Sequence, residues 1–424
     1  MSVNIIYGIT SSTTKFCKSK FNVKENVFVT TSGGEEYENT LSLSLIELAK
    51  LTVDIDKVII CAEAVTQILT SLKDINIPLE KCYFYNHSKN TLVPYKDIVT
   101  PKVTEEEILY SVYDLSINLP CFDVTNFVIL AELERKKRRL KHICFIILPN
   151  LSHSNTYIGA NQFHEKEDYE WRIDHIIKPV MRCIPTCLSI IELPYREKIK
   201  QILNADSHIY PQEIIKGQAN EKSSTVHLKP LKESGHNLAL LSPPKNAVKM
   251  VESFLQKLSK GQKLITVTLR EYQEQIVRNN DFDSWAKFLS KLDKDEFYPV
   301  IIRDSYFSTS PIPKALEGYL TFPEASSDYL IRLALYKAAY INMGVSTGPT
   351  YTISFIKNAK SLIFHPLNED NPASSSMTAK KSGLTIGKDY FFNDNKFQKT
   401  VWKPDSYENI KSNFDNLLEL INKS

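Results

Sequence analysis

Glycine is scarce in this chain, with 12 residues among 424. The one adjacent pair, Gly33-Gly34, stands outside any Gly-x-Gly-x-x-Gly pattern, so the dinucleotide-binding fingerprint is missing. A P-loop and the His-Glu-x-x-His pattern of zinc proteases are also missing. These absences exclude the nucleotide-binding and metalloprotease classes that depend on those motifs.

Long apolar runs are absent as well. No stretch reaches the roughly 18 uncharged apolar residues that a membrane span needs. The first residues lack the basic start and apolar core of a signal peptide. The seven cysteines form no Cys-x-x-Cys pair, and several lie in apolar runs, which is typical of reduced, buried thiols. We therefore expect a cytoplasmic protein without a transmembrane segment, with peripheral contact to the inner face of the membrane left open.

The chain also lacks a large excess of either positive or negative charge. The formal net charge is only +3, and the charges are mixed along the chain, which argues against a nucleic-acid partner. The basic run from Arg135 to Arg139 fits the solvated end of a helix, and a membrane-surface or anion patch is the alternative. No histidine stands at metal-ligand spacing from Cys183 and Cys187, so a metal site is not expected.

Strand patterns alternate with helical patterns throughout, which predicts an α/β fold with parallel sheets. The apolar run His142 to Leu148 is typical of a strand covered on both faces. We predict an N-terminal α/β subdomain over residues 1–100 and a Rossmann-like acceptor-side domain over residues 101–258. A second Rossmann-like, donor-binding domain is predicted over residues 259–424, with a cleft between the last two.

Charged residues follow the predicted strand from Leu264 to Leu269. Arg270 comes directly after it and should lie at the carboxyl edge of the sheet, where ligands of open α/β sheets bind. Arginine offers a planar fork of donors that suits a diphosphate. Glu271 could orient Arg270, act as a base or face water. Arg278 and Asn279 close the same loop and could add phosphate or sugar contacts.

Two further segments add polar candidates. Asp304 and Ser305 end the next strand, where an acid can bind ribose hydroxyls or simply cap a turn. Glu324 precedes a helical pattern, with serines that fit either a helix cap or an anion contact. Both segments are candidates for donor binding.

The sharpest short motif runs from Gly344 to Thr350. Gly348 permits close backbone approach, and Pro349 suits the first position of a helix. Such a helix start presents hydroxyls and unpaired amides to a phosphate, although a purely structural turn also explains it. The candidate donor-binding residues here are Ser346, Thr347, Gly348 and Thr350.

Acidic residues near predicted helix starts in the N-terminal half are candidates for a general base. These are Asp123, after Phe122, and Glu165, in the run His164-Glu165-Lys-Glu167. The alternative is that both are surface groups that stabilise a helix dipole.

The C-terminal pattern resembles sugar-nucleotide-dependent glycosyltransferases of the two-Rossmann GT-B fold. Leu264 to Asn280 is similar to the strand-plus-arginine segment of the fucosyltransferase type, and this implies a donor-diphosphate contact for Arg270. Val345 to Thr350 looks like the donor-phosphate turn of heptosyltransferase-like enzymes and sugar-nucleotide 2-epimerases. Tyr351 stands where the heptosyltransferase pattern commonly has histidine, and the paired arginines of the fucosyl type are missing.

Residues 112–149 resemble uncharacterised bacterial proteins from surface-polysaccharide gene clusters, through Phe122-Asp123 and the run Ala131 to Arg135. The resemblance implies a metal-independent glycosyltransferase without a cofactor. Its partners would be a nucleotide sugar and a glycan or lipid-linked acceptor, in cell-surface polysaccharide assembly. A sugar-nucleotide epimerase and a non-catalytic nucleotide-binding Rossmann pair are the alternatives.

Overall fold

The computed structural model describes residues 2–99, 104–150, 166–204, 206–216, 223–258, 261–272 and 276–424. The chain divides into two compact units, Met1–Thr104 and Glu105–Ser424. The division after Thr104 lies four residues from the boundary expected at residue 100. The second expected boundary, at residue 258, falls inside the larger unit.

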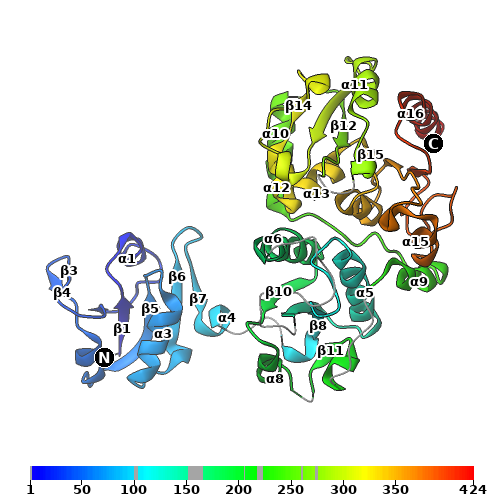
Figure 1. Ribbon diagram of the computed structural model, residues 1–424. Coiled ribbons are helices and arrows are strands. Elements are labelled where there is room, and N and C mark those ends of the chain that lie inside the picture. The colour runs from blue at the N-terminus through cyan, green and yellow to red at the C-terminus, as the bar shows by residue number, and fades with distance from the viewer. Residues whose placement is uncertain are drawn as a thin grey trace. The chain divides into compact units, whose positions relative to one another are not determined.

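The first unit has an α/β fold with a five-stranded sheet of order β2-β1-β5-β6-β7 (Figure 1). All neighbours are parallel except the β6–β7 pair. Numbered by their order in the chain, these strands run 2-1-3-4-5, the flavodoxin-like order. The elements are β1 (Ser2–Tyr7), α1 (Ser11–Cys17), β2 (Asn26–Val29), β3 (Glu36–Tyr37), β4 (Thr40–Leu41), α2 (Leu45–Ala49), β5 (Asp54–Ile60), α3 (Val65–Asp74), β6 (Cys82–Asn86), β7 (Thr91–Pro94) and α4 (Tyr95–Val99).

The second unit contains two parallel sheets. The first has the order β10-β9-β8-β11, or 3-2-1-4 by position in the chain. Its elements are β8 (Ile108–Asp114), α5 (Val124–Lys137), β9 (His142–Leu148), α6 (Lys166–Arg172), a π-helical segment (Ile173–Ile177), α7 (Lys178–Arg182), β10 (Cys187–Glu192), α8 (Ile199–Ile202) and β11 (His208–Tyr210). The strand expected over residues 142–148 is confirmed.

The second sheet of this unit has six parallel strands in the order β14-β13-β12-β15-β16-β17. By chain position this is 3-2-1-4-5-6, the Rossmann order, which reverses between β12 and β15. The strands are β12 (Lys263–Thr268), β13 (Phe297–Ile302), β14 (Leu320–Thr321), β15 (Ile341–Val345), β16 (Ser361–Phe364) and β17 (Gln398–Val401). The helices before, between and after these strands are α9 (Lys229–Glu233), α10 (Lys245–Leu258), α11 (Phe282–Ser290), α12 (Pro323–Ser327), α13 (Tyr329–Ala338), α14 (Gly348–Tyr351), α15 (Ser376–Lys381) and α16 (Tyr407–Asn422).

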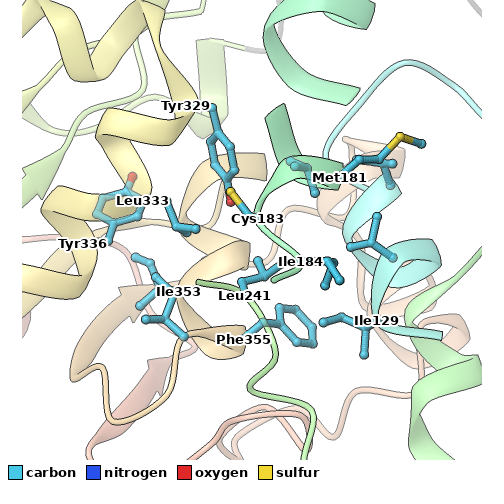
Figure 2. Packing of buried hydrophobic residues seen from close by; sticks show 14 of the residues in the cluster. Ile129, Met181, Cys183, Ile184, Leu241, Tyr329, Leu333, Tyr336, Ile353 and Phe355 are labelled. Carbon is cyan, nitrogen blue, oxygen red and sulfur yellow. The ribbon is translucent and has the colours of Figure 1, made fainter. Parts of the chain in front are cut away.

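One hydrophobic core joins the two halves of the second unit. Figure 2 shows Ile129 and Met181 of the first half together with Leu333 and Phe355 of the second, and all belong to one cluster of buried side chains. Helix α10 also packs on α13, and its Phe254 ring stacks on Phe322 with centroids 4.0 Å apart. The expected boundary placed α10 in the middle domain. However, α10 packs against α13 and Phe322, which belong to the C-terminal half of the second unit.

Arg135 and Arg138 form ion pairs with Glu132 and Glu134 at the end of α5, as expected for a helix terminus. All seven cysteines are free thiols, and four of them are buried. In the parts of the chain that the structure covers, no helix combines the length and apolar character that a bilayer span requires.

Candidate functional site

A pocket of about 1280 Å³ lies between the two halves of the second unit. Its N-terminal wall is formed by the loop after β8 and by the helix that contains the π-helical segment. Its C-terminal wall is formed by the residues that follow β12, β13 and β15. Ligands of open α/β sheets bind outside the carboxyl ends of the strands where the order reverses, and the pocket has this position.

Arg270 lines the pocket just beyond the end of β12, after Leu269. Its Nε atom is buried and has no hydrogen-bond partner, and its guanidinium lies 5.1 Å from the centroid of the Tyr272 ring. Burial, assisted by the charge of Arg278, lowers the pKa of Arg270 to about 10, while Asp304 acts in the opposite direction. A buried cation with an unused donor favours a bound anion at this position.

Arg278 lines the same pocket and reaches the turn after β15, where its Nη2 donates to the Ser346 carbonyl oxygen over 3.3 Å. Burial lowers the pKa of Arg278 as well. The charge of Arg278 also helps to lower the pKa of His365, at the end of β16, to about 4, although burial is the main cause. Two guanidinium groups therefore concentrate positive charge where β12 and β15 end.

Two asparagines hold the loop that carries these arginines. The Asn279 side chain accepts from the Tyr272 amide (3.0 Å) and donates to the Tyr272 carbonyl (2.9 Å). Asn280 Oδ1 accepts from the Arg270 amide (2.6 Å), and Asn280 Nδ2 donates to the Asp405 carboxylate (3.1 Å). Asn279 does not line the pocket, so it positions the loop rather than forming the donor contact expected from the sequence.

Glu271 has a different partner from the one expected. Its carboxylate accepts two hydrogen bonds from Arg303, at 2.8 and 2.6 Å, and both side chains are buried. Glu271 and Arg303 follow the adjacent strands β12 and β13, which brings them side by side. Because Glu271 is engaged in this ion pair and does not line the pocket, it neither orients Arg270 nor has the position of a base.

The turn after β15 places Thr347 and Gly348 in the pocket, but it offers fewer amides than the motif predicted. The Thr347 amide donates to Thr350 Oγ1 (2.9 Å), and the Thr350 amide returns a bond to Thr347 Oγ1 (3.4 Å). Pro349 has no N–H, and the helix that follows, α14, has only four residues. The expected row of free amides is therefore wrong, and within this turn only the Gly348 amide is left for a ligand.

Ser346 and Thr350 lie behind the pocket wall rather than on it. Thr350 is buried and its hydroxyl donates to the Val345 carbonyl (2.9 Å). Gly344 to Gly348 has the Gly-x-Ser-x-Gly spacing of a nucleophile elbow. However, the Ser346 hydroxyl is bonded by the hydroxyl of Tyr390 (3.4 Å), which in turn contacts His365 Nδ1 (2.6 Å). Ser346 and Thr350 thus stabilise the turn instead of facing a donor.

Asp304 and Ser305 line the pocket after β13. Asp304 accepts weakly from the Tyr306 amide (3.4 Å), and the Ser305 hydroxyl donates to the Ser326 carbonyl (2.5 Å). Glu324 is exposed in the first turn of α12 and does not reach the pocket. Its predicted donor contact is therefore not supported, because the helix turns its side chain to solvent.

On the N-terminal wall, Asp123 lines the pocket at the start of α5 without capping that helix through its side chain. Glu165 lies outside the described residues. The sequence reasoning missed four other residues of this wall and Arg332 of α13. The four, all on the helix of residues 166–182, are Asp168, Trp171, Arg172 and His175. Their spacing of three and four residues was the available signal, because it places them on one helix face.

No protein-family model matches the sequence, and no curated protein matches it. Among solved structures, the chain is similar to a glycosyl transferase family 9 protein from Veillonella parvula (12% identity, 72% of this chain and 88% of that one, TM-score 0.44). It is also similar to E. coli ADP-heptose LPS heptosyltransferase II (7% identity, 100% of both chains, TM-score 0.31). A third likeness is to UDP-GlcNAc 2-epimerase from Neisseria meningitidis (12% identity, 100% of this chain and 93% of that one, TM-score 0.30).

These TM-scores describe loose likenesses, so the description of the fold rests on the strand orders of this chain. Two Rossmann-like halves enclose a pocket between the carboxyl edges of their sheets. This is the two-Rossmann arrangement with a shared cleft that the sequence predicted, with an additional α/β unit before it.

Proposed function

We propose that this protein is a metal-independent glycosyltransferase that transfers a sugar from a nucleotide-sugar donor to a glycan or glycoconjugate acceptor in cell-surface polysaccharide assembly. The observation that carries the proposal is the buried, unpartnered Nε of Arg270 beside Arg278, in a pocket at the switch point of a Rossmann sheet. No cofactor is invoked, because the two arginines supply the positive charge that a departing diphosphate requires.

In this proposal the diphosphate lies over the ends of β12 and β15. Arg270 and Arg278 stabilise the negative charge that develops on the leaving nucleoside diphosphate as its bond to the sugar breaks. Arg278 is already held by the Ser346 carbonyl and Arg270 lies against the Tyr272 ring, so both cations are in place before the donor binds. The Gly348 amide adds one donor on the same side. Asp304 and Ser305, at the end of the neighbouring strand, are suited to the ribose hydroxyls.

The acceptor approaches from the N-terminal wall. Asp123 is the proposed general base: it takes the proton of the acceptor hydroxyl while that oxygen forms its bond to the sugar carbon. Phe122, its neighbour, packs against Gly348, which supports a position for Asp123 close to the proposed diphosphate site. The base and the two arginines then act on opposite sides of the sugar that is transferred.

Binding of nucleoside diphosphates to Arg270 variants tests the proposal. Thermal shifts with GDP, UDP, CDP and ADP identify the nucleotide, because a ligand of the native state raises stability. Arg270→Ala should weaken binding of that nucleotide by about 100-fold, and Arg270→Lys should restore it only in part because lysine lacks the planar fork. Arg182, which is exposed on α7 and away from the pocket, provides the control Arg182→Ala. Unchanged binding in Arg270→Ala would refute the proposal.

The same preparation separates transfer from epimerisation. A glycosyltransferase needs an acceptor to convert the donor into a glycoside, whereas an epimerase changes the donor sugar alone. Incubation with the matching nucleotide sugar and no acceptor, followed by NMR of the sugar ring, should leave the sugar configuration unchanged. A change of configuration would identify an epimerase and exclude the proposed transfer as the primary reaction.

A further inference from the structure

The helix on the N-terminal wall of the pocket is irregular where it meets the pocket. Between α6 and α7 it widens into the π-helical segment Ile173–Ile177. Such segments are rare, and they occur frequently at functional sites. His175 lies at the centre of this segment, and both His175 and Trp171 line the pocket. The proposed donor contacts and the proposed base use neither residue.

Trp171 and His175 form one rigid aromatic pair. Their rings stack with centroids 4.5 Å apart and planes only 5° apart, and Trp171 is 36% exposed. An exposed tryptophan whose ring is held in a fixed plane offers a flat apolar surface to a ligand at low entropic cost. The electron-rich face of an aromatic ring attracts partially positive hydrogens.

The hydrogen bond within the pair also determines the tautomer of the neutral histidine. His175 Nδ1 lies 2.9 Å from the Trp171 carbonyl oxygen. A carbonyl only accepts, so Nδ1 must carry a hydrogen and donate it. In the neutral imidazole, Nε2 is then an acceptor on the opposite edge of the ring. The pair therefore combines a flat apolar face with one oriented hydrogen-bond acceptor.

The charge of this wall distinguishes it from the opposite one. Asp168 lies about one helical turn before Trp171 and pairs with Arg172 (2.8 Å), and Asp123 lines the same wall. The carboxylates of the N-terminal wall face a pocket whose other side carries Arg270 and Arg278. Because Arg172, the arginine of this wall, is already paired with Asp168, the wall suits an uncharged, hydroxyl-bearing ligand rather than an anion.

We propose that Trp171 and His175 form the acceptor-sugar subsite, which takes an uncharged pyranose. The C–H face of the sugar stacks on the face of Trp171 that His175 leaves open. His175 holds the indole in its plane from the other side, and its Nε2 is left for a hydroxyl of the glycan beyond the stacked sugar. The role of this sugar as the acceptor rests on the proposed glycosyl transfer. The binding of a pyranose by Trp171 and His175 does not depend on catalysis.

Tryptophan fluorescence of the full chain tests the subsite. Trp285 is fully buried, and neither Trp285 nor Trp402 lines the pocket, so a change of emission caused by a ligand in the pocket is assigned to the exposed Trp171. The probes are methyl pyranosides of the gluco, galacto and manno series and their N-acetyl derivatives, each titrated to its solubility limit. At least one should change the emission. Its affinity, measured by calorimetry because Trp171→Ala removes the reporter, should fall about tenfold in Trp171→Ala and in His175→Ala.

The chain contains a matched control. Trp402 stacks on His365 with centroids 4.7 Å apart, and neither residue lines the pocket. Trp402→Phe should keep the pyranoside response. His175→Phe, which restores an aromatic ring against the indole, should recover part of the response that His175→Ala loses. Melting curves of Trp171→Ala that match the parent show that the variant is folded.

Two outcomes overturn the inference: no probe changes the emission, or the response persists unchanged in Trp171→Ala. A wrong proposed function would give a different result. The parent protein would then bind no nucleoside diphosphate, while pyranoside binding at Trp171 would remain. The opposite pattern, nucleotide binding through Arg270 without any pyranoside response, refutes the subsite alone.

Discussion

Gly348 is in direct contact with the ring of Phe122, which comes from the other half of the second unit. A Cβ atom at position 348 would lie 2.5 Å from Phe122 Cδ2 and 2.9 Å from Phe122 Cβ. Phe122 also packs on the Tyr329 ring, with centroids 5.3 Å apart. The glycine is therefore needed for the close approach of the two halves at the proposed diphosphate site, rather than for a left-handed backbone.

Gly348→Ala should destabilise the protein by about 1–3 kcal/mol, because the added methyl group overpacks a close contact. Urea unfolding measures the loss. In a Phe122→Ala background the same substitution should cost much less, since the clashing ring is gone, and the double-mutant cycle isolates the contact. Equal costs in both backgrounds would show that the ring is not what restricts position 348.

Removing one partner of the buried Glu271–Arg303 pair should be costly. Glu271→Ala leaves the Arg303 charge buried with only the carbonyls of Ser310 and Pro311, and unfolding should become easier by about 3–5 kcal/mol. The double variant Glu271→Leu/Arg303→Met should recover much of that loss. Asp415→Ala, which breaks the exposed Lys411–Asp415 pair, is the control and should change stability little.

His365 should make the stability depend on pH. Burial and the charge of Arg278 lower its pKa from 6.5 to about 4, so the unfolded chain binds this proton at a higher pH than the native protein does. The contribution is complete above pH 6.5 and declines as the pH falls towards 4, by up to about 3 kcal/mol. Urea unfolding across this window should show a shallower decline in His365→Gln; identical slopes would contradict the assignment.

The hydroxyl of Tyr351 links the two halves through the side chains of Asn126 (2.5 Å) and Thr225 (3.2 Å). Burial raises the pKa of Tyr351, so this hydroxyl keeps its proton. Tyr351→Phe leaves buried Asn126 without this donor and should cost about 1–3 kcal/mol in chemical denaturation. Tyr306→Phe, at a largely exposed tyrosine, should leave the midpoint unchanged.

The fold was most predictable where a strand is buried on both faces. The strand over 142–148 has the expected bounds, because interior parallel strands leave continuous apolar runs. Edge strands leave weaker signals: β14 has two residues, β11 has three, and β17 mixes polar with apolar residues. The helix predicted to begin at Pro349 is short: α14 ends at Tyr351, and a 3-10 turn, Thr352–Phe355, follows it.

The candidate site was predictable only along single strands and loops. Placing Arg270, Asp304 and Thr347 at one sheet edge required only the rule that ligands lie beyond carboxyl ends. The partner of Glu271 depended on the register between β12 and β13, which local sequence does not encode. Trp171 and His175 were missed because their role depends on which face of the helix meets the other half of the unit.

The loop that presents Arg270 is fastened by a residue far along the chain. Asp405 accepts hydrogen bonds from Asn280 Nδ2 and from the indole of Trp285, and the Asn280–Asp405 contact spans 125 positions. During synthesis on the ribosome, the strand that precedes Arg270 is complete long before Asp405 has been added. The nascent protein can thus assemble most of its Rossmann sheet while the arginine still lacks this anchor, so that the proposed anion site is completed among the last steps of synthesis.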